Sequence, residues 1–203
     1  MNSTTITTAA TSIIDAIYDQ KKKRNIWEDS NWSHIADLEN DDVGKAGEKI
    51  IEMMCKRGNI PSEIDGLKTK ELGGGVGDGI INGKTVEIKT ARLGSNNTSF
   101  QHELGECPWV ANYMIFLDIA PDKMYLTIFK NFTEEFYKSS GCDSSLKCIP
   151  YFPTKSICWR KQKGAFKLDT TVAINMKSQF TFKLDAGASN WLEMTEFINS
   201  NIH

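Results

Sequence analysis

The dipeptide Asn82-Gly83 constrains the fold of this 203-residue chain more tightly than any other feature of its sequence. A type I′ turn needs a positive φ at both of its central residues, and Asn-Gly is the pair that meets this requirement most readily. If the turn forms there, pairing can be counted outward, which places Gly79 opposite Val86 and Asp78 opposite Glu87. The sequence therefore predicts a β-hairpin of fixed register, with the fifteen residues 77–91 as its two arms.

The predicted hairpin places three charged side chains on one face. Directly opposed residues such as Asp78 and Glu87 have Cβ atoms roughly 5 Å apart, and like charges so placed repel each other. Lys89 lies two residues beyond Glu87 and shares its face, whereas Val86 and Ile88 form the apolar opposite face. This pattern predicts a divalent cation between the two acids. The alternative interpretation is an exposed hairpin with a solvated polar face.

A run of glycines precedes Asp78, from Gly73 to Gly77 with Val76 as its only exception. Glycine has no Cβ, so another backbone or a ligand can approach such a segment closely. This run favours a binding site at the hairpin over a plain solvated face.

Composition is typical of a single globular domain, with 40% apolar and 25% charged residues. No apolar run approaches the roughly 20 residues that a membrane-spanning helix needs, and the first residues lack the pattern of a secretory signal. The five cysteines are an odd count without close pairs, which favours reduced thiols. We therefore expect a cytoplasmic protein with no membrane partner; a structural zinc at Cys142, Cys148 and Cys158 is the minor alternative.

A formal net charge of -2 argues against a uniformly basic surface but permits local basic patches, which are what phosphate binding needs. One basic segment, 21–24, closes a predicted helix, where it can simply complement the helix dipole. The other, from Trp159 to Lys163, combines an aromatic residue with cations and leads to Lys167. It is the stronger candidate for nucleic-acid contact, the alternative being a solvated loop.

Hydrophobic periodicity predicts an α/β fold with a mixed sheet. The residues Asp41-Asp42 start a helix and Gly58-Asn59 end it. The predicted helices span 12–23, 41–56, 133–138 and 190–198, with a loop or short helix over 27–40. The predicted strands are 68–72, the two arms of the 77–91 hairpin, 113–119, 124–129 and one or two within 172–184. A loop or helix is predicted up to residue 102, and a loop-rich insertion over 139–165.

Asp78 followed by Glu87-Ile88-Lys89 on the adjoining strand resembles the core of the PD-(D/E)XK nuclease superfamily. The segment Gly44–Glu48 resembles the core helix of that family, although Gly77 stands where the family name has proline. The resemblance covers roughly residues 41–129. It implies a restriction-endonuclease-like fold, with a mixed central β-sheet flanked by helices, and a single nuclease domain over residues 1–203.

The resemblance also implies a chemistry for the site. Phosphodiester hydrolysis in this family uses Mg²⁺, here bound by Asp78, Glu87 and the carbonyl of Ile88, with Lys89 beside the attacking water or the scissile phosphate. Glu48 can complete the metal site. Glu52, one helical turn further on, competes with Glu48 for that role.

Several residues are candidates for contact with DNA. Thr90 and Arg92 extend the strand that carries Lys89. Gln101 and His102 follow within short reach, although for these two we favour the alternative that they lie on a helix surface. The segment at Trp159 supplies the remaining candidates, namely Trp159, Arg160, Lys161 and Lys163.

The size of the chain and the absence of ATPase motifs resemble a type II restriction endonuclease, which acts on double-stranded DNA as a homodimer because two-fold protein symmetry matches a palindromic site. Two alternatives stay open. One is a recombination or repair nuclease such as a junction resolvase. The other is a non-catalytic DNA-binding domain on a nuclease fold.

Overall fold

The computed structural model describes residues 3–21, 25–65, 76–94, 99–105, 109–132, 158–162, 165–171, 181–185 and 191–203. Its helices are α1 (Ser3–Lys21), the 3₁₀ helix η1 (Ser33–Asp37), α2 (Asn40–Arg57) and α6 (Trp191–Asn201). Its strands are β1 (Ser62–Ile64), β2 (Gly79–Ile81), β3 (Lys84–Arg92), β4 (Ser99–Gly105), β5 (Tyr113–Ala120), β6 (Lys123–Lys130), β7 (Cys158–Gln162), β8 (Ala165–Thr171) and β9 (Thr181–Asp185).

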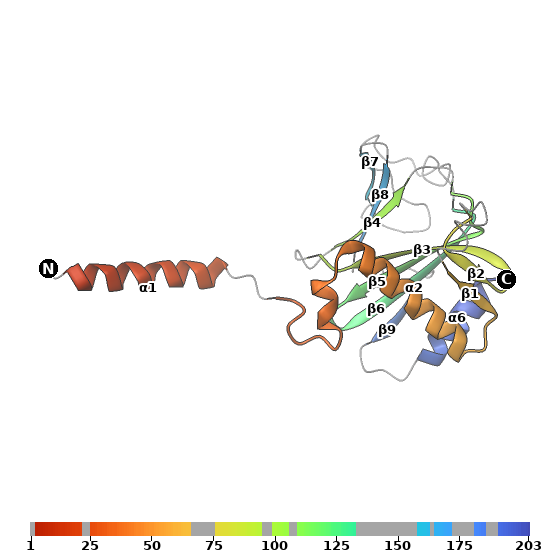
Figure 1. Cartoon of the computed structure of the whole chain (residues 1–203), viewed down its shortest axis with the longest axis horizontal. Helices are drawn as coiled ribbons and strands as arrows, with labels where there is room; N and C mark the ends of the chain where they lie inside the picture. The colour runs from red at the N-terminus through yellow and green to blue at the C-terminus, as the bar shows by residue number, and fades with distance from the viewer. Residues whose placement is uncertain are drawn as a thin grey trace.

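The main sheet has six strands in the order β1-β2-β3-β5-β6-β9 (Figure 1). Its only parallel pair among the described strands is β3 with β5, and the other neighbours are antiparallel. The α/β class with a mixed sheet is therefore confirmed.

The hairpin forms as predicted. Gly79 pairs with Val86, and Ile81 pairs with Lys84. Both turn residues have positive φ, 50° at Asn82 and 73° at Gly83. The side-chain amide of Asn82 also donates a hydrogen bond to the backbone carbonyl of Ile202, which ties the turn to the last residues of the sequence.

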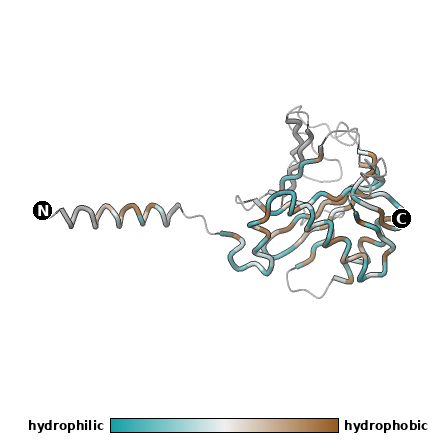
Figure 2. Tube along the Cα trace, viewed as in Figure 1, coloured by the Kyte–Doolittle hydropathy of each residue, from teal (hydrophilic) through white to brown (hydrophobic). Residues whose placement is uncertain are grey.

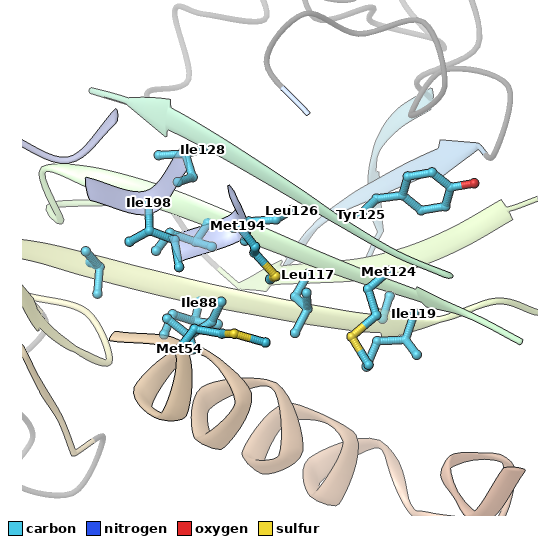
Figure 3. Packing of buried hydrophobic residues seen from close by; sticks show 14 of the residues in the cluster. Met54, Ile88, Leu117, Ile119, Met124, Tyr125, Leu126, Ile128, Met194 and Ile198 are labelled. Atoms are coloured by element: carbon cyan, nitrogen blue, oxygen red, sulfur yellow. The ribbon is translucent and has the colours of Figure 1, made fainter. Parts of the chain in front are cut away.

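Helix α2 packs along the main sheet with a narrow buried stripe. Its predicted start and end are confirmed to within a residue, and Gly58 follows its last residue. The stripe of buried residues recurs every three or four positions, as expected for one helical face; it comprises Val43, Gly47, Ile51, Met54 and Cys55. Figure 3 shows α2 running beneath the strands, with Met54 toward Ile88 of β3.

Helix α6 completes the cover of that sheet face. Met194 and Ile198 are fully buried in the same cluster as Met54, and the cluster continues across the sheet through Ile88, Leu117 and Leu126 (Figure 3). The predicted terminal helix is thus confirmed, and it packs into the core.

A second sheet of three strands, in the order β4-β8-β7, stands over one end of the main sheet (Figure 1). Two predictions were wrong here. Residues 99–102, expected in a loop or helix, belong to strand β4, and the end of the expected loop-rich insertion over 139–165 contains β7 and the first residue of β8. The predicted strand 68–72 and helix 133–138 lie outside the described residues.

Helix α1 begins earlier than predicted and extends away from the rest of the chain (Figure 1). Its apolar residues Ile13, Ile14, Ile17 and Tyr18 are exposed, and Figure 2 shows this hydrophobic stretch in the middle of the helix. None of the helices in the described ranges is both long and apolar enough to cross a membrane.

Candidate active site

The strand pairing of the hairpin stops one residue short of Asp78. The backbone N–H of Asp78 donates to the carbonyl of Val86 at 2.7 Å, and its carboxylate accepts the N–H of Ile88 at 2.7 Å. Gly77 makes this bend possible, since it has a φ of 101° and a Cβ there would lie 2.2 Å from the carbonyl oxygen of Val86. Asp78 is therefore bound to the edge of β3 by hydrogen bonds to Val86 and Ile88. The cross-strand pairing of Asp78 with Glu87 that the sequence predicts does not form.

Glu87 has a different partner from the one that the sequence predicts. Its carboxylate lies 2.5 Å from the ammonium of Lys89, and both side chains are largely buried, at 22% and 24% exposure. Because these residues are two apart on β3, they share the face that the alternation predicts. The repulsion expected between Asp78 and Glu87 is replaced by an ion pair between Glu87 and Lys89.

Glu48 belongs to the same cluster, although it comes from α2. Burial raises the pKa of Glu48, and the negative charge of Asp78 raises it further, while Lys49 and Lys89 act in the opposite direction. Glu52, by contrast, pairs with Lys49 at 2.7 Å on the exposed side of the helix. Of the two glutamates, Glu48 is therefore the one that lies near Asp78 and Lys89.

The edge of β3 beyond Ile88 faces this cluster. Strand β2 has three residues and β3 has nine, and β2 pairs no further than Val86. Alternate residues of a strand direct their N–H and C=O groups to the same neighbour. Because the N–H of Ile88 points to Asp78, its carbonyl lies on the same edge, as the resemblance implies.

A pocket of about 870 Å³ opens in front of this edge. Strand β3, the first half of α2 and β4 form its walls. Glu48, Asp78, Lys89 and Gln101 line it, as do Lys45 and Glu103. Its volume and mixed charge fit an extended polar ligand rather than a small apolar one.

Thr90 and Arg92 line the pocket but are engaged with the protein. One guanidinium nitrogen of Arg92 donates to the carbonyls of Ile35 and Leu38, each at 2.5 Å. The hydroxyl oxygen of Thr90 is buried with no hydrogen-bond partner, and it faces Gly47 of α2. Arg92 therefore joins β3 to η1, whereas Thr90 only packs against α2.

His102 is buried rather than exposed. Its Nε2 lies 2.6 Å from the carboxylate of Asp118, and the two side chains are 0% and 1% exposed. Its ring packs edge-on against Phe116, so His102 joins β4 to the main sheet and leaves Gln101 on the pocket side. The alternation of Phe100, His102 and Leu104 with polar residues was the sequence signal for this strand.

The basic segment lies on the second sheet. Trp159, Arg160 and Lys161 belong to β7, and Arg160 is the register partner of Lys167 in β8. Lys163 lies outside the described residues, as do the side chains of β7 and β8. The structure therefore places the backbone of this segment on the sheet to which β4 belongs.

The donors at the pocket fit a hard divalent cation. Carboxylate and carbonyl oxygens are the ligands that Mg²⁺ takes, and it is commonly held by one or two carboxylates plus waters. Burial raises the pKa of Glu48, and the negative charge of Asp78 adds to the effect; a cation bound nearby would act in the opposite direction. Within the described ranges, no three His, Cys, Asp or Glu side chains already form a metal cluster.

Comparisons with known proteins identify no relative. No family model, no curated protein and no solved structure matches this chain. The geometry of the pocket is therefore what any functional proposal rests on.

Proposed function

We propose that this protein is a Mg²⁺-dependent endonuclease that hydrolyses phosphodiester bonds of double-stranded DNA. The observation that carries the proposal is the meeting of Glu48, Asp78 and Lys89 at the open edge of β3. Two segments far apart in the sequence, α2 and the hairpin, contribute these residues to one pocket, and their residue types are those that the PD-(D/E)XK resemblance implies.

Each residue has a role that follows from its position. Asp78, Glu48 and the carbonyl of Ile88 would hold Mg²⁺, and Glu87 would join them when it leaves Lys89. The bound cation would polarise the scissile phosphate and lower the pKa of a water. Lys89 would then stabilise the negative charge that develops on the phosphate.

The pocket also supports an extended substrate. Gln101 of β4 and Lys45 of α2 line opposite walls, where they can contact the DNA on either side of the cleaved bond. The basic β7 strand lies on the same sheet as Gln101, so its cations would bind DNA backbone further from the metal.

Among such nucleases, we favour a type II restriction endonuclease in the cytoplasm that acts as a homodimer. A pocket with one set of acids cleaves one strand at a time, so a double-strand break at a short palindromic site needs two copies.

The test is incubation with a sequenced plasmid and Mg²⁺, followed by mapping of the new ends. Discrete fragments that disappear when the metal is chelated are the expected result. Cleavage confined to branched DNA would instead indicate a junction resolvase. Binding with no cleavage in Mg²⁺ or Mn²⁺ would reduce the protein to a DNA-binding domain and overturn the proposal.

A further inference from the structure

The contact between Gly47 of α2 and Thr90 of β3 is unusually close. A Cβ built on Gly47 would lie 1.7 Å from the hydroxyl oxygen of Thr90, 2.7 Å from its Cβ and 2.8 Å from its methyl carbon. Non-bonded carbon atoms prefer separations of about 3.5–4.0 Å. No rotation of the Thr90 side chain relieves this overlap, because the Cβ of Thr90 is fixed to the strand.

The contact between Gly47 and Thr90 lies beside two of the pocket residues, one on each element. Glu48 follows Gly47 directly on α2, and Thr90 follows Lys89 directly on β3. Gly47 is in the buried stripe of the helix, whereas Glu48 lines the pocket beside it. The separation of α2 from β3 at this point therefore sets how closely Glu48 approaches Asp78.

Other contacts fix the helix on either side of this point. Before the helix, Arg92 binds the carbonyls of Ile35 and Leu38. Further along α2, Met54 is buried in the same cluster as Ile88. Since both sides are held, a side chain at position 47 would push the middle of α2, where Glu48 lies, away from the strand.

We propose that Gly47 is a positioning residue for the metal site, acting as a spacer that lets Glu48 reach the cation held by Asp78. The inference rests on the proposed function, since it assigns Glu48 to the same Mg²⁺. Only glycine at position 47 allows the helix to lie against Thr90, and the metal site needs that separation.

The same helix offers a matched control. At Gly44, one turn earlier, a Cβ would have no atom within 4 Å apart from its chain neighbours and the nearby backbone of its own helix. The substitutions Gly44→Ala and Gly47→Ala make the same chemical change and the same gain in helix propensity. They differ in whether the new methyl group has room.

The experiment measures Mg²⁺ binding to the metal-free protein by calorimetry, with DNA cleavage measured in parallel. Gly47→Ala is expected to weaken Mg²⁺ binding by about 10- to 100-fold, the usual effect of disturbing a group that orients a metal ligand. Gly44→Ala is expected to bind Mg²⁺ as the wild type does. Circular dichroism and the melting temperature establish that each variant is folded.

A compensating substitution separates spacing from general damage. Thr90→Gly removes the three nearest atoms that the new Cβ would meet. The loss of Mg²⁺ affinity from Gly47→Ala should therefore be smaller in the T90G protein, where G47A/T90G is compared with T90G, than in the wild type. Unchanged Mg²⁺ binding in folded Gly47→Ala would overturn the inference. So would an equal loss in Gly44→Ala, or no recovery in the double variant.

The failure of the proposed function looks different. If the wild-type protein itself neither binds Mg²⁺ nor cleaves DNA, the function falls, and the spacer role falls with it. If the wild type binds and cleaves normally and Gly47→Ala does the same, only the spacer role falls.

Discussion

Lys89 is the residue whose environment most directly predicts a chemical role. It is held by Glu87 at 2.5 Å and is only 24% exposed, yet it lines the pocket. A partly buried ammonium beside a phosphate stabilises developing charge more strongly than an exposed one, because the local dielectric is lower.

Replacing Lys89 with alanine is therefore expected to lower the rate of cleavage at saturating DNA by about 100-fold or more, while DNA affinity stays close to that of the wild type. Lys49→Ala removes the same charge from the exposed side of α2, where Lys49 pairs with Glu52, and serves as the control. Single-turnover cleavage and fluorescence anisotropy measure the two quantities. If Lys89→Ala bound DNA poorly but cut normally at saturation, Lys89 would be a docking residue.

Cys55 gives a prediction about pH. It is fully buried, and burial raises the pKa of its thiol from 9.0 to about 11. Between those values the thiol ionises in the unfolded chain but not in the folded one, so the unfolded state binds fewer protons and stability falls as pH rises. The full effect is about 2–3 kcal/mol.

The free energy of unfolding is thus expected to fall more steeply between pH 9 and 11 in the wild type than in Cys55→Ala. Tyr125, whose pKa burial raises to about 12, acts in the same direction in both proteins and cancels in the difference. Urea titrations at pH 8, 9, 10 and 11 provide the comparison, and parallel curves would show that Cys55 titrates normally in the folded state.

Among the elements, β3 joins the main sheet to the helix layer and to the segment before α2. Arg92 at its end donates to the carbonyls of Ile35 and Leu38, so a residue predicted to bind DNA also holds η1 in place. Hydrogen bonds from a charged donor contribute about 1.5–3 kcal/mol in favourable cases.

Arg92→Ala is accordingly expected to lower the free energy of unfolding by about 2 kcal/mol, independent of any DNA. Lysine at position 92 should recover only part of the loss, because its ammonium lacks the planar fork of a guanidinium. Denaturant unfolding measures both variants. An Arg92→Ala protein that is as stable as the wild type but binds DNA weakly would assign Arg92 to the phosphate backbone instead.

At the scale of helices and strands, the sequence could predict the features that depend only on residues close to one another in the chain. The turn at Asn82-Gly83 needs only its own two residues, so the hairpin register was predictable from neighbouring chemistry. Strand β4 was missed because His102 occupies a core position, and its burial depends on Asp118, sixteen residues away. Because His102 is polar, it interrupts the apolar alternation that Phe100 and Leu104 begin and end, which leaves only two apolar positions to mark the strand.

The site shows the same division between local and long-range information. Asp78, Glu87 and Lys89 were predicted as site residues from the hairpin alone, but the orientation of Asp78 depends on the positive φ of Gly77 and on the N–H of Ile88. The choice of Glu48 over Glu52 depends on how α2 lies on β3. Helical periodicity alone places both glutamates on neighbouring turns and does not separate them.

For the whole molecule, the number of copies on DNA remains a prediction. The helices at the two ends of the chain differ in exposure, because α6 packs into the core whereas α1 exposes Ile13, Ile14 and Ile17. Sedimentation of the protein on a duplex with one site, in Ca²⁺ to prevent cleavage, is expected to give two copies per duplex. A single copy that makes concerted double-strand breaks would contradict the homodimer.

The central claim is that Asp78 holds a catalytic cation at the edge of β3, and substitution of Asp78 tests it most directly. Asparagine keeps an oxygen that can accept the N–H of Ile88 but carries no charge. Alanine removes both, at a stability loss of about 1 kcal/mol. Glu87→Gln is the corresponding change at the second acid.

The deciding measurement is Mg²⁺-dependent cleavage of plasmid DNA by the wild type, Asp78→Asn and Glu87→Gln, each checked for folding by its urea midpoint. The account predicts discrete cleavage by the wild type and a loss of about 1000-fold in both variants, with the unfolding free energy of Asp78→Asn within about 1 kcal/mol of the wild type. Wild-type cleavage rates in a folded Asp78→Asn protein would contradict the account.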